Sequence, residues 1–254
     1  MLERLLTAEV FALMLIFARL GSALILMPGF GENYVSPRVR LLLAGAITIV
    51  VAPVVAPRLP GLPGSPVALT LLLGGEIGIG LFFGTVVRIT MIALEIAGTV
   101  ISFQIGLATA SIFNPLLSDQ GSVTSVLITI TGLVLMFQTD MHHLMLRALI
   151  DSYTLFTPGN LPPIGDFTEV ISRTVTRSFA IGMQLSAPFL VILTLMYIAL
   201  GLMSRLMPQL QIFFVALPLQ IGLGFLILLL TFSTLMLWFL ENFGDVLRMF
   251  VGST

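Results

Sequence analysis

The sequence has 254 residues, of which 57% are hydrophobic and only 9% are charged, and this composition excludes an ordinary soluble domain, in which roughly 25% of residues are charged. The net charge of −1 and the scattered arginines exclude a basic surface for nucleic acid. Because cysteine is absent, disulfides, thiolate metal sites and cysteine nucleophiles are excluded as well. We therefore predict an all-α, multi-helix integral membrane protein with six or seven long apolar helices.

The first half of the chain contains four predicted helices. A membrane-spanning helix needs about 20 mainly apolar residues. Such stretches lie at 8–27, 39–56, 67–87 and 89–110. Arg19 lies inside the first stretch, and Arg88 separates the third from the fourth. We interpret the first stretch as a retained helix, because it carries Glu3 and Glu9 and has no convincing cleavage site for a secretory signal.

Several ionisable side chains lie in these apolar stretches, where a charge at the bilayer centre costs on the order of a few kcal/mol. Glu95 follows Arg88 by about two helical turns, so one continuous helix would place both on the same face, as a buried structural pair or a pore-lining pair. Glu76 lies among glycines at 74, 78, 80 and 84, which allow close helix packing. We predict that Glu76 and Glu95 serve assembly and not proton transport.

The segment 103–121 differs from its neighbours in content. It mixes glycine, small polar residues and bulky apolar residues around Asn114-Pro115, which stops a helix. Irregular backbone of this kind cannot face lipid, so it must be buried in protein or line a cavity. From the residues alone, an ordinary interhelical turn and a functional loop both remain open.

A fifth helix is predicted at 123–137, and its apolar pattern could continue through 138–143 to 149. Its Ser and Thr content favours a protein or water environment over lipid. Asp140, His142 and His143 follow, but adjacent histidines on a helix point about 100° apart and no third ligand stands at i+4. We expect a polar helix end there and predict no metal, cofactor or catalytic site.

Two further helices, at 178–202 and 212–240, flank a tight polar elbow. Arg205 would cap the first of them, because a cation stabilises the negative end of the helix dipole. Pro208 prevents the helix from continuing, and Gln209 completes the elbow. The polar stretch 151–177 is the best candidate boundary between a larger N-terminal part and this C-terminal hairpin.

Short motifs in a particular order run through nearly the whole chain, and together they resemble the FliR family of type III secretion export-gate proteins. They are Arg19-Leu20-Gly21 with Pro37-Arg38-Val39-Arg40, Gln104-Ile105-Gly106-Leu107 with Asn114-Pro115, His143, Ser152-Tyr153, Ala187-Pro188, and Arg205 with Pro208-Gln209. Asn114, Met141 and Tyr197 depart from the family's usual residues.

The resemblance implies a non-enzymatic subunit of the flagellar protein export gate in the bacterial inner membrane and basal body. Its partners would be FliP- and FliQ-like membrane proteins and other export-apparatus proteins, with unfolded proteins in transit and lipid around it. Residues 1–177 would be FliP-like and 178–254 FliQ-like. The loop 106–122 would be a pore plug, whose residues include Gly106, Ile112, Phe113, Asn114, Pro115, Leu116 and Leu117. Its four large apolar residues, Ile112, Phe113, Leu116 and Leu117, would seal the pore against ions. The predicted polar contacts for assembly are Arg19, Glu76, Arg88, Glu95, Arg205 and Gln209.

A self-sufficient secondary transporter is the alternative, with Glu76, Glu95 and Asp140 as proton or cation sites. Such transporters usually show internal repeats, and the two halves of this chain show no clear self-similarity. We therefore favour the gate subunit over the transporter.

Overall fold

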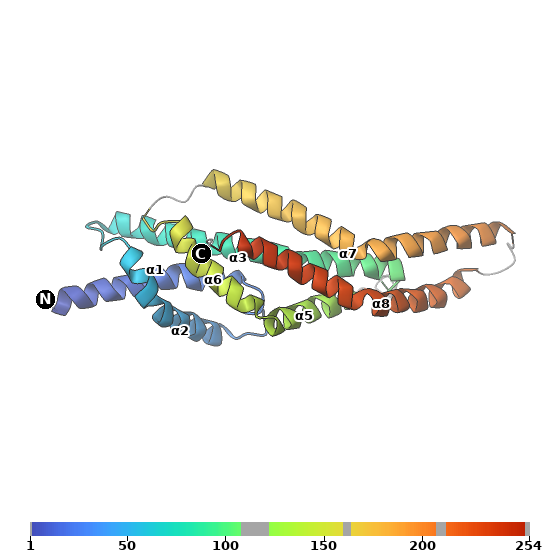
Figure 1. Ribbon diagram of the computed structural model, residues 1–254, viewed down its shortest axis with the longest axis horizontal. Helices are drawn as coiled ribbons and strands as arrows, with labels where there is room; N and C mark the ends of the chain where they lie inside the picture. Colours follow the sequence, from blue (N-terminus) through green and yellow to red (C-terminus); the bar gives the residue numbers. More distant parts are fainter. Residues whose placement is uncertain (1, 108–121, 160–163, 207–211, 252–254) are drawn as a thin grey trace. The chain divides into compact units, whose positions relative to one another are not determined.

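A computed structural model of the chain describes residues 2–107, 122–159, 164–206 and 212–251, and every regular element within these ranges is helical (Figure 1). The predicted all-α class is therefore confirmed. The elements are α1 (Leu2–Leu26), α2 (Pro37–Val55), a short 3-10 helix η1 (Ala56–Arg58), α3 (Pro66–Ile105), α5 (Val123–Gln138), α6 (Met141–Leu155), α7 (Ile164–Leu206) and α8 (Ile212–Arg248).

α3 is one continuous helix of 40 residues, whereas the sequence predicted two helices separated at Arg88. Arginine is a good helix former, so one arginine within an apolar run does not end the helix. Its long side chain instead leaves the helix surface and pairs with Glu32. The prediction of a break at this position was wrong.

α7 begins at Ile164, so much of the polar stretch 151–177 is helical and not a loop. Polar residues support the start of α7, where Glu169 and Arg173 form an ion pair one turn apart. The predicted boundary between residues 177 and 178 lies inside this helix. The division of the chain into FliP-like and FliQ-like parts stays a prediction.

Five of the described helices are each long and apolar enough to cross a membrane, and a sixth span results if α5 and α6 are counted together. α3, α7 and α8 are much longer than one span requires. Their 40, 43 and 37 residues correspond to about 60, 65 and 55 Å at about 1.5 Å per residue. A bilayer has a hydrocarbon core only about 30 Å thick.

The helices group into two compact units. The first contains residues 1–90, 139–175 and 243–254, and the second contains 91–138 and 176–242. α3, α7 and α8 each contribute to both units.

In the first unit, the buried face of α1 supplies much of the core, including Leu15, Leu20 and Leu24. An aromatic cluster lies elsewhere in the same unit. The ring of Phe82 stacks on that of Phe167 with centroids 3.9 Å apart, and both rings meet Phe156 edge-on. This cluster joins α3 to the beginning of α7.

In the second unit, glycines bring α5, α7 and α8 close to α3. A Cβ atom added at Gly98 of α3 would lie 2.3 Å from the Cα of Ser125 in α5. A Cβ at Gly182 of α7 would lie 2.9 Å from the carbonyl oxygen of Ala93. Contacts this short require glycine, so these helix pairs pack backbone against backbone.

Candidate functional site

Arg19 is a fully buried charged residue of the first unit, and its side chain is completely inaccessible. Its guanidinium donates two hydrogen bonds to the carboxylate of Glu76, from Nε to Oε2 at 2.6 Å and from Nη2 to Oε1 at 3.0 Å. Two-pronged pairs of this kind combine charge with fixed geometry. The sequence predicted the two residues separately as polar contacts, and the structure joins them across α1 and α3.

α6 completes the environment of the Arg19 guanidinium. Nη1 donates to Oγ of Ser152 at 3.3 Å, and Nη2 donates to the carbonyl oxygen of Phe156 at 3.0 Å. The ring of Tyr153 lies with its centroid 3.9 Å from Cζ, in a cation–π contact. A buried ion pair is tolerated when its remaining donors are satisfied in this way. The cluster therefore ties three helices together inside one chain.

Glycines explain how α1 comes close enough to α3 for this pair to form. A Cβ at Gly80 would lie 2.2 Å from the carbonyl oxygen of Arg19, and a Cβ at Gly84 would lie 2.7 Å from that of Ala23. By contrast, a Cβ at Gly74 or Gly78 would meet nothing within 4 Å among the described residues. Gly80 and Gly84 therefore pack against α1, whereas Gly74 and Gly78 remain open on the surface of this chain.

The sequence had suggested that Arg88 pairs with Glu95, but Arg88 has a different partner in the structure. Its Nη1 lies 2.5 Å from Oε1 of Glu32, in the connection between α1 and α2. Glu95 is exposed. Spacing along a helix identifies residues on one face, but it does not reveal a partner in a distant loop. Glu32 was missed for this reason.

Arg40 was also not predicted as a polar contact, although it belongs to one of the motifs on which the family resemblance rests. It fixes the same connection through hydrogen bonds to the carbonyl oxygens of Phe30, Glu32 and Val35. Together, Arg40 and Arg88 hold the turn between α1 and α2 in a defined conformation.

The predicted plug lies largely outside the described residues, which include Gly106 but not Ile112, Phe113, Asn114, Pro115, Leu116 or Leu117. Gly106 has a φ of +83°, a conformation that favours glycine, and it follows the last residue of α3. The N–H groups of Gly106 and Leu107 donate to the carbonyl oxygens of Phe103 and Ser102, the hydrogen-bond pattern of a Schellman helix end.

The chain returns to described structure at Ser122, on the other side of that segment. Oγ of Ser122 accepts a hydrogen bond from the N–H of Ser125 at 3.0 Å, which caps the start of α5. The same hydroxyl donates to the carbonyl oxygen of Gly98 at 3.3 Å. Serines that suggested a polar environment for α5 therefore hold its first turn against α3.

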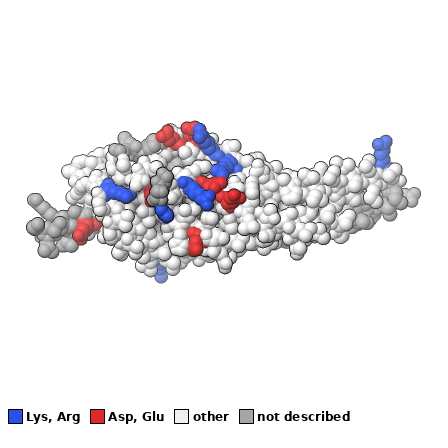
Figure 2. Space-filling view, viewed as in Figure 1, with Lys and Arg blue, Asp and Glu red and all other residues white. Residues whose placement is uncertain are grey.

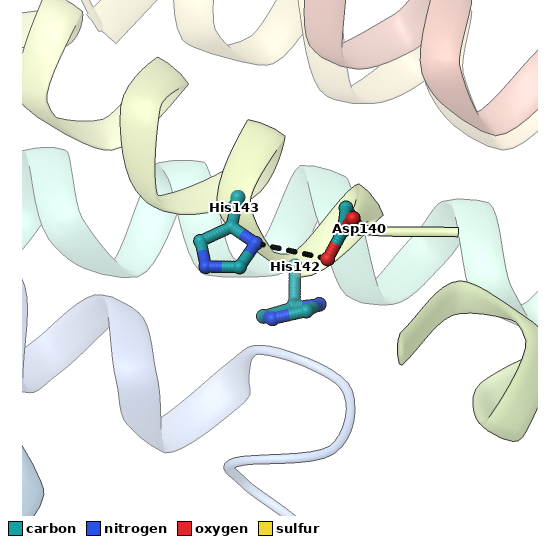
Figure 3. A group of neighbouring side chains, drawn as sticks. All are labelled: Asp140, His142 and His143. Carbon is teal, nitrogen blue, oxygen red and sulfur yellow. Dashed lines mark hydrogen bonds and ion pairs between the residues drawn. The ribbon is translucent and has the colours of Figure 1, made fainter. Parts of the chain in front are cut away.

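Asp140, His142 and His143 lie closer together than their spacing suggested (Figure 3). The two imidazole centroids are 4.1 Å apart, and Nδ1 of His143 lies 3.2 Å from Oδ1 of Asp140. One ligand atom from each residue falls within 4.8 Å of the others. Asp140 and His143 are exposed at the start of α6, consistent with a solvated helix end. The absence of a metal site stays a prediction.

The predicted elbow is described on its two sides only. α7 ends at Leu206 with Arg205 in its last turn, and α8 begins at Ile212. Arg205 is exposed in this last turn. Gln209 and Pro208 lie outside the described residues.

Many large apolar side chains are exposed on the long helices. Figure 2 shows large areas without a charged side chain on the face drawn. Exposed apolar residues of α7 include Val175, Phe179, Val191, Leu195, Ile198, Leu202 and Leu206. This surface is suited to lipid or to other membrane proteins.

Comparison with known proteins places these features in a family. Residues 10–246 match the family model described as bacterial export proteins, family 1. The chain is similar to the flagellar biosynthetic protein FliR of Caulobacter vibrioides, with 34% identity over 95% of this chain and 96% of that protein. FliR of Bacillus subtilis is 29% identical over 88% of this chain and 87% of its own length. The Yop proteins translocation protein T of Yersinia pestis is 33% identical over 64% of this chain and 63% of its own length.

Proposed function

Because this chain belongs to family 1 of the bacterial export proteins and is a non-enzymatic component of the flagellar export gate, we propose that it forms part of the wall of the pore that carries unfolded flagellar proteins across the inner membrane. Its neighbours in that wall are FliP- and FliQ-like membrane proteins. The other flagellar export-apparatus proteins adjoin the gate in the basal body.

The observation that carries this proposal is the length of apolar surface on single helices. Exposed apolar side chains on α7 run from Val175 to Leu206, a distance of about 46 Å at about 1.5 Å per residue. On α3 the exposed large apolar side chains lie between Val67 and Leu81 and again at Phe103, whereas the stretch between is largely buried. A hydrocarbon core of about 30 Å cannot cover the apolar length on α7. Other protein chains must cover the remainder, which supports a closed hetero-oligomer.

Within this assembly, the loop 106–122 serves as the seal of the pore. The sequence supports this role, because Ile112, Phe113, Leu116 and Leu117 supply bulky apolar surface and an apolar constriction excludes ions by dewetting. The N-terminal part, 1–177, provides FliP-like packing, and the hairpin at 178–254 provides FliQ-like packing.

Extraction of the tagged chain from membranes of flagellated cells tests the proposal. We expect it to co-purify in a stable complex with two other small membrane proteins of the flagellar export apparatus. A monomer or a homo-oligomer recovered from the same membranes, with those proteins present and extracted, would contradict it.

A further inference from the structure

The C-terminal end of α3 carries an unusual hydrogen bond. The last carbonyl groups of any helix lack partners within the helix. At the end of α3, the carbonyls of Ser102 and Phe103 are satisfied by the turn at Gly106 and Leu107. That of Gln104 is satisfied by a side chain from α8, since Nε2 of Gln220 donates to it at 2.6 Å.

Gln220 is almost completely buried, with 3% of its surface exposed, in a helix that is apolar around it. Burying an amide is costly unless its hydrogen bonds are made. Both hydrogens on Nε2 have partners, because the same nitrogen lies 2.5 Å from the hydroxyl of Tyr197 in α7. A carbonyl oxygen can only accept, so the contact with Gln104 also fixes the orientation of the amide.

Two glycines fit the backbones of α3 and α8 together at this point. A Cβ at Gly106 would lie 3.0 Å from Nε2 of Gln220. One turn further along α8, a Cβ at Gly224 would lie 2.4 Å from Cγ1 of Ile105. Two successive turns of α8 therefore hold the last turn of α3.

We propose that Gln220 is a positioning residue, which fixes the end of α3 to the α7–α8 hairpin and thereby sets where the chain leaves α3 towards residues 108–121. The inference rests on the proposed function, since it assigns Gln220 to the sealed state of the gate. It concerns Gln104, Gly106 and Gln220, which the structure describes.

The test uses the complex purified with its partner membrane proteins and reconstituted into vesicles. Gln220→Leu removes both hydrogen bonds, and at about 1 kcal/mol each their loss corresponds to a rise in baseline ion conductance of about 30-fold. Tyr197→Phe removes only the second bond, so we expect a rise of about fivefold, with unchanged assembly. Unchanged conductance in assembled Tyr197→Phe and Gln220→Leu complexes would overturn the inference. If the Gln220→Leu complex does not assemble, the conductance of the Tyr197→Phe complex alone tests the inference.

A covalent replacement distinguishes positioning from general stabilisation. Because the chain has no cysteine, Ile105→Cys with Gly224→Cys provides a single pair, and the short distance between these positions is within reach of a disulfide. In the Tyr197→Phe or Gln220→Leu complex, oxidation should restore the low conductance and reduction should reverse it. Conductance that stays high although the disulfide has formed would also overturn the inference.

The same preparation separates this inference from the proposed function. If Gln220 variants conduct normally but a deletion within 106–122 raises conductance, the positioning role of Gln220 is contradicted and the proposed function in the gate is supported. If the chain does not assemble with export-apparatus proteins at all, the proposed function fails first.

Discussion

At the scale of single residues, the pairing of Arg19 with Glu76 bears on whether the buried carboxylate of Glu76 carries protons or holds helices together. A proton carrier would need a carboxyl group that can exchange its proton during transport. Glu76 instead accepts two hydrogen bonds from a guanidinium that is itself enclosed by α6. The pair therefore joins α1 to α3, and we expect Glu76 to serve packing and not proton transport.

Replacing Glu76 by Gln should destabilise the chain strongly. The substitution leaves the charge of Arg19 buried without a counter-charge, and breaking a buried pair in this way costs about 3–5 kcal/mol. We expect a lower yield of folded protein and a lower midpoint of thermal unfolding in detergent.

Glu95→Gln provides the matched control, since Glu95 is exposed and lies in the same helix. It should fold normally and leave export of flagellar proteins largely intact. Loss of export in an assembled Glu95→Gln complex would restore a proton-relay role for this residue.

At the scale of helices, the glycines of α3 have two distinct roles. Gly80→Ala should disturb folding of the chain, because the added Cβ would overlap the backbone of α1, and overpacking of this kind costs about 1–3 kcal/mol. Gly78→Ala should leave the isolated chain unchanged, since a Cβ there meets nothing within 4 Å among the described residues. Protease resistance of the two variants in detergent measures the difference, and equal sensitivity would contradict this assignment.

The sequence predicted most helices from apolar length alone. It failed where tertiary contacts decide. α3 continues past Arg88 because Glu32 receives the charge, and α7 begins early because Glu169 and Arg173 stabilise its polar first turns. Helical spacing also could not identify the partners of Arg19 or Gln220, which lie 57 and 116 residues away.

At the scale of the assembled gate, the proposed function depends on the seal formed by the loop 106–122. Phe113→Ala should increase ion leakage through the assembled gate without preventing assembly, because a smaller apolar side chain weakens exclusion of ions by dewetting. Dye entry into cells that overproduce the complete complex measures the leak. Phe225→Ala, which alters an exposed phenylalanine of α8, is the control and should not leak. Equal leakage in the two variants would argue against a seal at Phe113.

We propose that exported proteins pass along this chain inside the assembled gate, and photo-crosslinking can trap them there. A crosslinking amino acid is introduced at position 113, and an export substrate fused to a tightly folded domain is arrested during transport. We expect a covalent adduct between this chain and the arrested substrate, and its formation should depend on the partner membrane proteins. Absence of any adduct from positions throughout 106–122, with the substrate demonstrably arrested in the complete complex, would contradict it.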